Sequence, residues 1–289
     1  MAHTVHFTKM HGAGNDYIYV YLPDNPVADP RRASIMLSRP HFGIGSDGLI
    51  LIDRCDTKAA DFRMRIFNND GSEARMCGNG IRCVGKYVYD HGLTRDTTLR
   101  IQTLSGIKQI RLHVRDGQVE AATVDMGVPE VKDALGDDRR RLRSEEEQEG
   151  LRVKDEGLRV KGVRVSMGNP HYVCFVPDVM SVDVASEGSC LEYEAMPGER
   201  CNVEFATLRP DGTIRMRVWE RGSGITLACG TGACATAVAA SLLGLTGRTS
   251  QVQMDGGTLS IAWAEDGHVL MTGPAETVFE GTVTLNYEL

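Results

Sequence analysis

Two segments of the sequence place a cysteine directly before a glycine-rich turn. Residues 77–80 read Cys-Gly-Asn-Gly and residues 229–232 read Cys-Gly-Thr-Gly. Both segments follow an alternating strand pattern and a polar turn, and both open a stretch whose apolar residues recur at helical spacing. The repeat predicts two similar domains, each carrying one cysteine at the start of its central helix.

A thiol at the N-terminus of a helix has a physical reason to ionise. The unpaired N–H groups and the helix dipole favour a thiolate, and they also favour a carboxylate ligand. Flanking glycines let the backbone approach that ligand closely. The sequence therefore predicts that Cys77 and Cys229 are reactive and that each helix start can bind an anionic group.

Two such helices aimed at one point would invert the configuration of an amino acid. A pseudo-twofold axis between the domains would bring Cys77 and Cys229 face to face. One thiolate would remove the Cα proton and the other thiol would deliver a proton to the opposite face. N–H donors would stabilise negative charge on the carboxylate, so no metal, pyridoxal phosphate or nucleotide is required.

Other interpretations of the cysteines stay open at this point. A glycine-rich loop before a helix can hold phosphate, but neither segment has the Lys-Ser/Thr ending of a P-loop. Cys77 and Cys229 could also form a regulatory disulfide in a redox-sensing or binding protein. The eight cysteines include no Cys-x-x-Cys pair, which argues against a zinc site, and most of them are expected to be buried small hydrophobes.

Composition narrows the class of protein. The chain has 289 residues, 42% of them hydrophobic and 25% charged, with a net charge of -7. This is enough for one large or two ordinary domains, and its acidity argues against a nucleic-acid partner. Apolar runs are too short for a membrane helix, and residues 1–4 show no signal-peptide pattern. We expect a cytoplasmic protein with reduced thiols.

Strands dominate the predicted elements. Residues 62–67 and 213–219 alternate apolar and basic side chains, as a half-buried strand does. Further strands are predicted at 99–103, 109–114, 172–176 and 203–208, with turns at 255–257 and 265–267.

Three helices are predicted, at residues 29–38, 79–89 and 231–245. The third is rich in alanine and carries few charges, so we expect it to be buried on most sides. Residues 137–161 are highly charged and contain a seven-residue repeat. We expect an exposed insertion there, with no assigned function.

Further blocks accompany the two cysteine segments, and together they resemble the diaminopimelate epimerase family along most of the chain. The matching blocks are residues 9–16 (KMHGAGND), 43–48 (GIGSDG), 68–83, 168–171 (GNPH), 202–205 (NVEF) and 220–235.

The resemblance implies an α/β (α+β) fold of two similar domains related by pseudo-twofold symmetry. Each domain would be a curled mixed β-sheet around a central helix, with the last strand returning to the first domain. The domains would span residues 1–124 with 274–289, and residues 125–273. The resemblance also implies a cofactor-independent isomerase that converts LL- to meso-diaminopimelate in lysine and peptidoglycan-precursor biosynthesis, and a homodimer.

The resemblance assigns roles to individual residues. Cys77 would be the base at the LL stereocentre and Cys229 the acid, with the roles reversed in the back reaction. Arg221 would bind the distal carboxylate and Glu220 the ammonium, while His171 and Glu220 would orient the neighbourhood of the cysteines. The remaining substrate-binding positions are Asn15, Asn68, Gly78, Asn79, Asn169, Asn202, Gly230 and Thr231.

The nearest rival of the same fold is a proline or hydroxyproline racemase. Such enzymes also use two cysteines but usually carry a histidine after the first Cys-Gly, where this chain has Asn79. They would not need the additional asparagines. The sequence therefore favours the epimerase.

Overall fold

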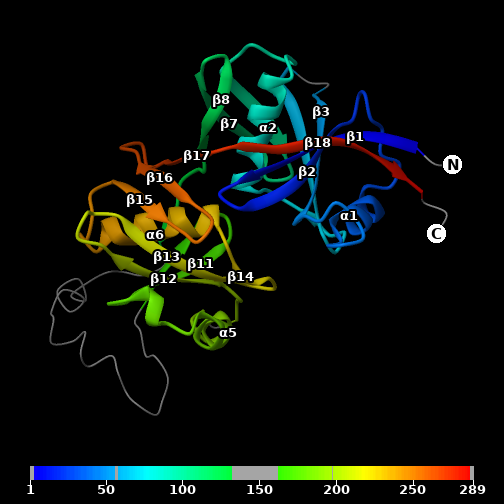
Figure 1. Cartoon of the computed structure of the whole chain (residues 1–289). Coiled ribbons are helices and arrows are strands. Elements are labelled where there is room, and N and C mark those ends of the chain that lie inside the picture. The colour runs from blue at the N-terminus through cyan, green and yellow to red at the C-terminus, as the bar shows by residue number, and fades with distance from the viewer. Residues whose placement is uncertain (1–2, 56–57, 132–161, 197, 287–289) are drawn as a thin grey trace. The chain divides into compact units, whose positions relative to one another are not determined.

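The computed structural model describes residues 3–55, 58–131, 162–196 and 198–286. The described residues form two compact units (Figure 1), unit 1 within Met1–Asp125 and Thr272–Leu289 and unit 2 within Met126–Met271. The charged insertion expected at 137–161 lies outside the described residues. Among the described helices, none combines the length and the apolar composition needed to span a membrane.

Unit 1 is a mixed sheet with two helices in the described residues. Its elements are β1 (His3–Gly12), β2 (Asn15–Tyr21), α1 (Pro30–Ser38), β3 (Gly48–Arg54), β4 (Phe62–Asn68), β5 (Glu73–Ala74), α2 (Gly78–Asp90), β6 (Thr98–Thr103), β7 (Gly106–Arg115), β8 (Gln118–Asp125) and β18 (Glu276–Leu285). β18 returns from the end of the chain to pair with β1 in antiparallel fashion.

Unit 2 contains the corresponding elements of the second half. They are β9 (Glu130–Val131), β10 (Val163–Ser166), β11 (Pro170–Phe175), the 3-10 helix η1 (Val179–Ser181), α5 (Val184–Glu194), β12 (Asn202–Leu208), β13 (Ile214–Glu220), β14 (Gly224–Thr226), α6 (Gly230–Leu242), β15 (Thr249–Gln253) and β16 (Thr258–Trp263). β17 (Val269–Pro274) crosses the boundary between the units.

The two units share one pattern of strand pairing. In unit 1, β1–β2 is antiparallel, β2–β3 parallel, β3–β4 and β4–β5 antiparallel, β4–β6 parallel and β6–β7 antiparallel. In unit 2, β10 to β16 repeat this sequence of pairings in the same order. The predicted duplication and the mixed α/β fold class are thereby confirmed.

The central helices are α2 in unit 1 and α6 in unit 2. α2 packs against β1, β2, β7 and β8, while α6 packs against β10 to β13 and against β15 and β16. Nearly every residue of α6 before Ser241 is buried, which confirms the expectation drawn from its alanine content. α6 ends at Leu242, earlier than predicted, because Gly244 adopts a left-handed φ of 68° and the Leu245 N–H donates to the Ala240 carbonyl.

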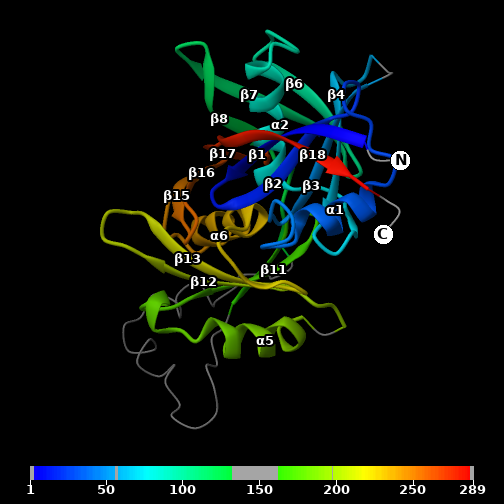
Figure 2. The same cartoon turned by 45° about the vertical axis from the view of Figure 1, so that its right-hand side comes forward.

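Helix α5 was not predicted from the sequence. It begins after Asp183, whose side chain accepts a hydrogen bond from the Ser186 N–H, and it packs on β12 and β13 (Figure 2). A Cβ added at Gly188 would lie 2.4 Å from the Cβ of Trp219, so a glycine in mid-helix permits this close approach. Because glycine lowers helix propensity, the local sequence does not predict this helix.

Strand β12 separates two environments. Val203 and Phe205 join the core cluster that also contains Val184 of α5. Alternation along the strand turns Asn202 and Glu204 to the opposite face. A Cβ added at Gly232 of α6 would lie 2.6 Å from Glu204 Oε1, so this opposite face lies under the start of α6.

Candidate active site

Cys77 is the N-cap residue of α2. Its backbone is extended, with φ -140° and ψ 114°, and its Sγ accepts a hydrogen bond from the Gly80 N–H at 3.3 Å. The residue is half-buried. A backbone donor aimed at sulfur favours its anionic form, as the position at a helix start predicts.

Asn15 connects Cys77 to an acidic side chain. The thiol donates to Asn15 Oδ1 at 3.3 Å, and Asn15 Nδ2 donates to Asp47 Oδ2 at 2.7 Å. The Asp16 N–H also donates to Asp47, at 3.1 Å, while burial raises the pKa of this carboxyl. Burial, followed by the charges of Cys77 and Asp47, raises the pKa of Tyr17. The hydrogen bond to Asp47 therefore holds the Asn15 amide with its oxygen toward Cys77.

The other predicted residues of unit 1 lie close to the start of α2 or at the end of β4. Asn79 is 3% exposed, and its Oδ1 is buried without a hydrogen-bond partner among the described residues. The Gly78 carbonyl accepts from Nη1 of the fully buried Arg82 at 3.2 Å. Asn68 ends β4 and donates from Nδ2 to Ser72 Oγ at 2.9 Å.

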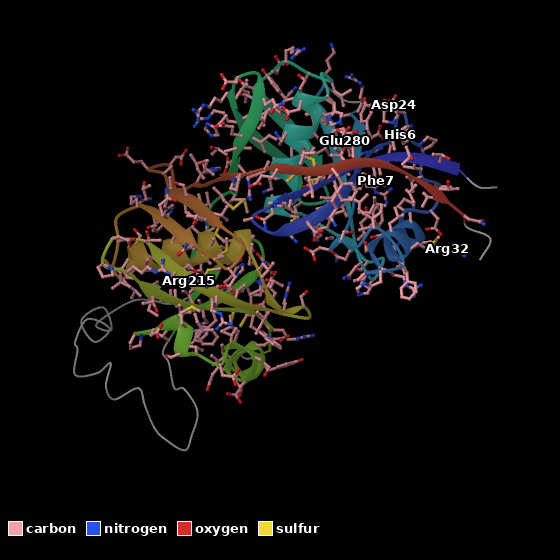
Figure 3. The ribbon with its side chains drawn as sticks, in the orientation of Figure 1. His6, Phe7, Asp24, Arg32, Arg215 and Glu280 are labelled. Carbon is pink, nitrogen blue, oxygen red and sulfur yellow. The ribbon has the colours of Figure 1, made fainter. Side chains whose placement is uncertain are left out.

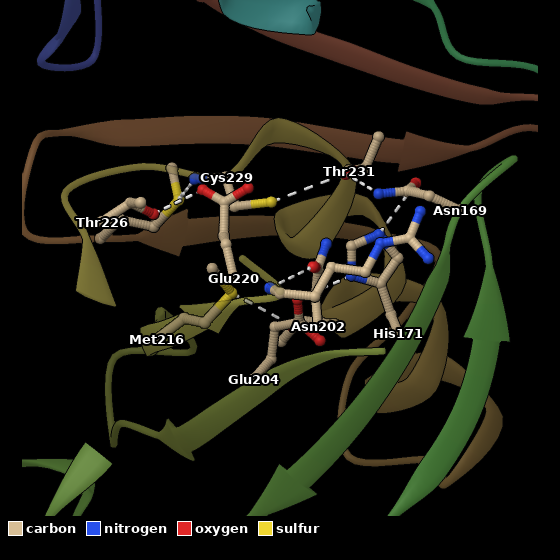
Figure 4. Close-up of polar contacts among 12 residues, drawn as sticks. Asn169, His171, Asn202, Glu204, Met216, Glu220, Thr226, Cys229 and Thr231 are labelled. Atoms are coloured by element: carbon tan, nitrogen blue, oxygen red, sulfur yellow. Dashed lines mark hydrogen bonds and ion pairs between the residues drawn. The ribbon is translucent and has the colours of Figure 1, made fainter. Parts of the chain in front are cut away.

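Cys229 occupies the equivalent position in unit 2, as N-cap of α6, with φ -127° and ψ 108°. Its Sγ lies 3.6 Å from the Thr231 hydroxyl (Figure 4), and its backbone N–H donates to Met254 Sδ at 3.4 Å. The residue is 5% exposed, more buried than Cys77. The two cysteines thus share backbone geometry but differ in surroundings.

The pKa of Cys229 is raised well above its ordinary value. Burial is the main cause, and the charges of Glu220 and Glu204 add to it, whereas contacts to Thr231 and Gly232 act in the opposite direction. At Cys229 the position at a helix start therefore does not by itself lower the pKa of the thiol. Desolvation and two nearby carboxylates outweigh the helix N–H groups.

A chain of polar contacts extends from Cys229 into the core of unit 2. Asn169 Nδ2 donates to Thr231 Oγ1 at 3.3 Å, and Asn169 Oδ1 lies 3.1 Å from His171 Nε2. The other ring nitrogen of His171 lies 2.7 Å from Glu204 Oε1. Glu204 is not among the predicted site residues, although a glutamate within the apolar strand 203–208 is a signal that the sequence contains.

Glu220, Asn202 and Arg221 lie beside this chain of contacts. The Thr226 hydroxyl donates to Glu220 Oε1 at 2.5 Å, and burial raises the pKa of Glu220. Asn202 Oδ1 accepts from the Arg221 N–H at 3.0 Å. The Arg221 guanidinium is exposed and donates to the Arg200 carbonyl, so it is available to a ligand at the surface of unit 2.

The predicted site residues fall into two sets. Cys77 and Asn15 gather with their neighbours in unit 1, and Cys229, Asn169 and His171 gather with theirs in unit 2. The approach of Cys77 to Cys229 stays a prediction. A separate cavity of about 500 Å³ in unit 1 is lined by residues outside the predicted set. They include His6, Phe7, Asp24 and Glu280, whose positions are labelled in Figure 3.

Comparison with known proteins gives close relatives over the whole chain. The family model described as diaminopimelate epimerase matches residues 7–132 and 163–278. A diaminopimelate epimerase of Bacteroides thetaiotaomicron is 54% identical over 282 residues, covering 97% of this chain and 98% of the relative. One of Phocaeicola vulgatus is 52% identical, covering 99% and 100%.

Solved structures of lower identity share the fold. A hydroxyproline epimerase of Agrobacterium vitis superposes with a TM-score of 0.73 at 14% identity, covering 99% of this chain and 94% of that one. A phenazine biosynthesis protein of the PhzF family from Bacillus anthracis gives 0.71 at 18%, covering 98% and 99%. The family model and the relatives of about half identity decide the family, and this chain belongs to the diaminopimelate epimerases.

Proposed function

We propose that this protein is an isomerase that interconverts LL- and meso-diaminopimelate through two cysteine side chains. The observation that carries the mechanism is the pair of Cys-capped helices, α2 and α6, at equivalent places in two units of the same pairing pattern. Family membership supplies the substrate. We infer that the two units act as the two catalytic domains.

Cys77 is the base and Cys229 the acid when LL-diaminopimelate reacts. The Cys77 thiolate removes the Cα proton, and the Cys229 thiol donates its proton to the opposite face of the same carbon. The raised pKa of Cys229 supports this assignment, because an acid must hold its proton at neutral pH. Microscopic reversibility exchanges the roles in the back reaction.

The helix starts bind the carboxylate at the reacting carbon. Gly78, Asn79, Gly230 and Thr231 lie in the first turns of α2 and α6, where N–H groups have no partner within the helix. These donors stabilise the negative charge that develops when Cα loses its proton. In this proposal, backbone N–H groups of the chain therefore supply the hydrogen bonds to the reacting carboxylate.

The remaining polar residues recognise the rest of the substrate. Arg221 is exposed and suits the distal carboxylate, which a guanidinium binds in a fork. Glu220 suits an ammonium group. The amides of Asn15, Asn68, Asn169 and Asn202 are the further substrate contacts in this proposal.

The test is turnover by fully reduced protein in D2O. Wild type with LL-diaminopimelate should form meso product and incorporate deuterium at Cα. Cys77→Ser and Cys229→Ser should each lose nearly all turnover, because inversion needs an acid and a base together. Wild type that turns over proline instead of diaminopimelate would overturn the substrate, and full activity of either variant would overturn the mechanism.

We further infer a homodimer in the cytoplasm, on the strength of the family resemblance. Light scattering of the purified, reduced chain tests the first of these inferences. A mass equal to one chain across a range of concentrations would contradict it.

A further inference from the structure

Glu204 is a fully buried carboxylate beneath the start of α6. Its Oε1 lies 2.7 Å from His171 Nδ1, and both side chains have an exposed fraction of 0%. Its Oε2 is buried without a hydrogen-bond partner among the described residues. Because burial of a lone carboxylate is unfavourable, the contact with His171 is the interaction that can stabilise Glu204 in this position.

Both ring nitrogens of His171 face oxygen atoms. Nδ1 faces the Glu204 carboxylate, and Nε2 faces Asn169 Oδ1 at 3.1 Å. The Asn169 amide is oriented with its Nδ2 toward Thr231 Oγ1, so its oxygen is the atom turned to the ring. Two oxygen acceptors on opposite ring nitrogens are the pattern of an imidazolium, which donates from both.

Unit 1 shows that packing alone does not require a carboxylate at this place. Strand pairing makes Gly48 the equivalent of Asn202, so Ile50 is the equivalent of Glu204. An added Cβ at Gly80 would lie 2.7 Å from Ile50 Cδ1, and an added Cβ at Gly232 would lie 2.6 Å from Glu204 Oε1. An apolar side chain fills the space in one unit, and a charged one fills it in the other.

We propose that Glu204 is a positioning residue: its carboxylate keeps the imidazole of His171 doubly protonated, and the cationic ring fixes the Asn169 amide against Thr231, beside Cys229. Glu204 acts through His171 and touches no reacting atom. The proposal rests on the proposed function, because Asn169 and Thr231 are substrate-binding residues only in the epimerase mechanism.

Several charged or titratable groups face this chain of contacts. Glu204 belongs to β12 and Glu220 to β13, and the charge of Glu220 interacts with His171. Cys229 lies at the start of α6. Glu220 accepts a hydrogen bond from Thr226, and the two ring nitrogens of His171 contact Glu204 and Asn169. Glu204 is therefore the carboxylate that neutralises the ring.

The decisive variant is Glu204→Gln, which keeps the shape and removes the charge. Its amide oxygen can still accept from Nδ1, so the ring should lose its second proton near neutral pH and the Asn169 amide should turn over. We expect kcat to fall roughly tenfold to a hundredfold at pH 8. The loss should be smaller at acid pH, because protonation of the ring restores the second N–H donor.

Nuclear magnetic resonance of ¹⁵N-histidine-labelled protein tests the first step without turnover. His171, assigned with His171→Asn, should carry protons on both ring nitrogens in wild type at pH 8 and on one in Glu204→Gln. A singly protonated ring in wild type overturns the proposal even if Glu204→Gln fails to fold. This spectrum also separates the proposal from the epimerase function, because it needs no substrate.

Two further variants control the kinetic step. Glu192→Gln removes another buried carboxylate of unit 2, which binds Arg200 and Trp219, and should leave the pH profile of kcat unchanged. Glu204→Asp keeps the charge and should retain a profile like that of wild type. The positioning role would be overturned if the wild-type ring is doubly protonated but the pH profile of kcat is the same in Glu204→Gln and wild type.

Discussion

The Sγ of Cys77 lies 3.3 Å from Oδ1 of Asn15, and Nδ2 of the same amide donates to Asp47 at 2.7 Å. Asn15 begins β2 and Asp47 lies just before β3, so the parallel pairing of β2 with β3 brings them together. The amide therefore has one orientation, with its oxygen toward the sulfur. Asn15 therefore orients the Cys77 thiol.

Replacing Asn15 by alanine should lower kcat for LL-diaminopimelate by roughly twofold to tenfold, because it removes the neutral hydrogen bond that orients the Cys77 thiol, and such a bond contributes about 0.5–1.5 kcal/mol. Steady-state kinetics on reduced protein measure this. Asn25→Ala is the matched control, since Asn25 is also in unit 1 but accepts from the His6 N–H. Equal kcat in the two variants would contradict the role of Asn15.

Glu220→Gln should change how stability depends on pH. The pKa of Glu220 is raised above 4.5, chiefly by burial, so the folded state binds its proton more tightly than the unfolded state. Its contribution to the free energy of unfolding is fully present below about pH 4.5 and is lost as pH rises through the raised pKa. Glutamine has no such loss.

Urea denaturation of wild type and Glu220→Gln at several pH values tests this sign. The free energy of unfolding of the variant, relative to wild type, should increase as pH rises above 4.5. A difference that stays constant or decreases with pH would show that Glu220 is not destabilised by its burial.

Alkylation of the native, reduced protein at pH 8 should separate the cysteines by burial. Cys190 is exposed and should be modified, whereas Cys83 and Cys201 should be protected. Burial raises the pKa of Cys83 to about 11 and that of Cys201 to about 12, so almost no thiolate forms at pH 8. Mass spectrometry of peptides measures each site, with urea-denatured protein as the control. Rapid modification of Cys83 in native protein would contradict the packing of α2.

Gly188→Ala should destabilise unit 2 although alanine favours helices. The new methyl group would lie 2.4 Å from the Cβ of Trp219, and such overpacking costs about 1–3 kcal/mol, more than the roughly 1 kcal/mol gained in helix propensity. Denaturation in urea measures the difference. Gly247→Ala is the control, because no atom lies within 4 Å of its added Cβ. A more stable Gly188→Ala protein would show that α5 shifts freely.

Local patterns in the sequence were sufficient for the duplication, the family and the helix starts at Cys77 and Cys229. A Cys-Gly-x-Gly turn followed by apolar residues at helical spacing is a short-range signal, and alternation in residues 62–67 is another. Both patterns depend only on residues that are close in the sequence, so they can be recognised without the tertiary structure.

Tertiary structure decided what surrounds each cysteine. Glu204 contacts His171 only because β11 and β12, which α5 separates in the sequence, pair in parallel. No local pattern specifies that contact. The raised pKa of Cys229 likewise comes from burial and from carboxylates on two other strands, which outweigh the helix start that the sequence displays. Desolvation and charge act through space, so similar Cys-capped turns acquire different chemistry once the strands around them have paired.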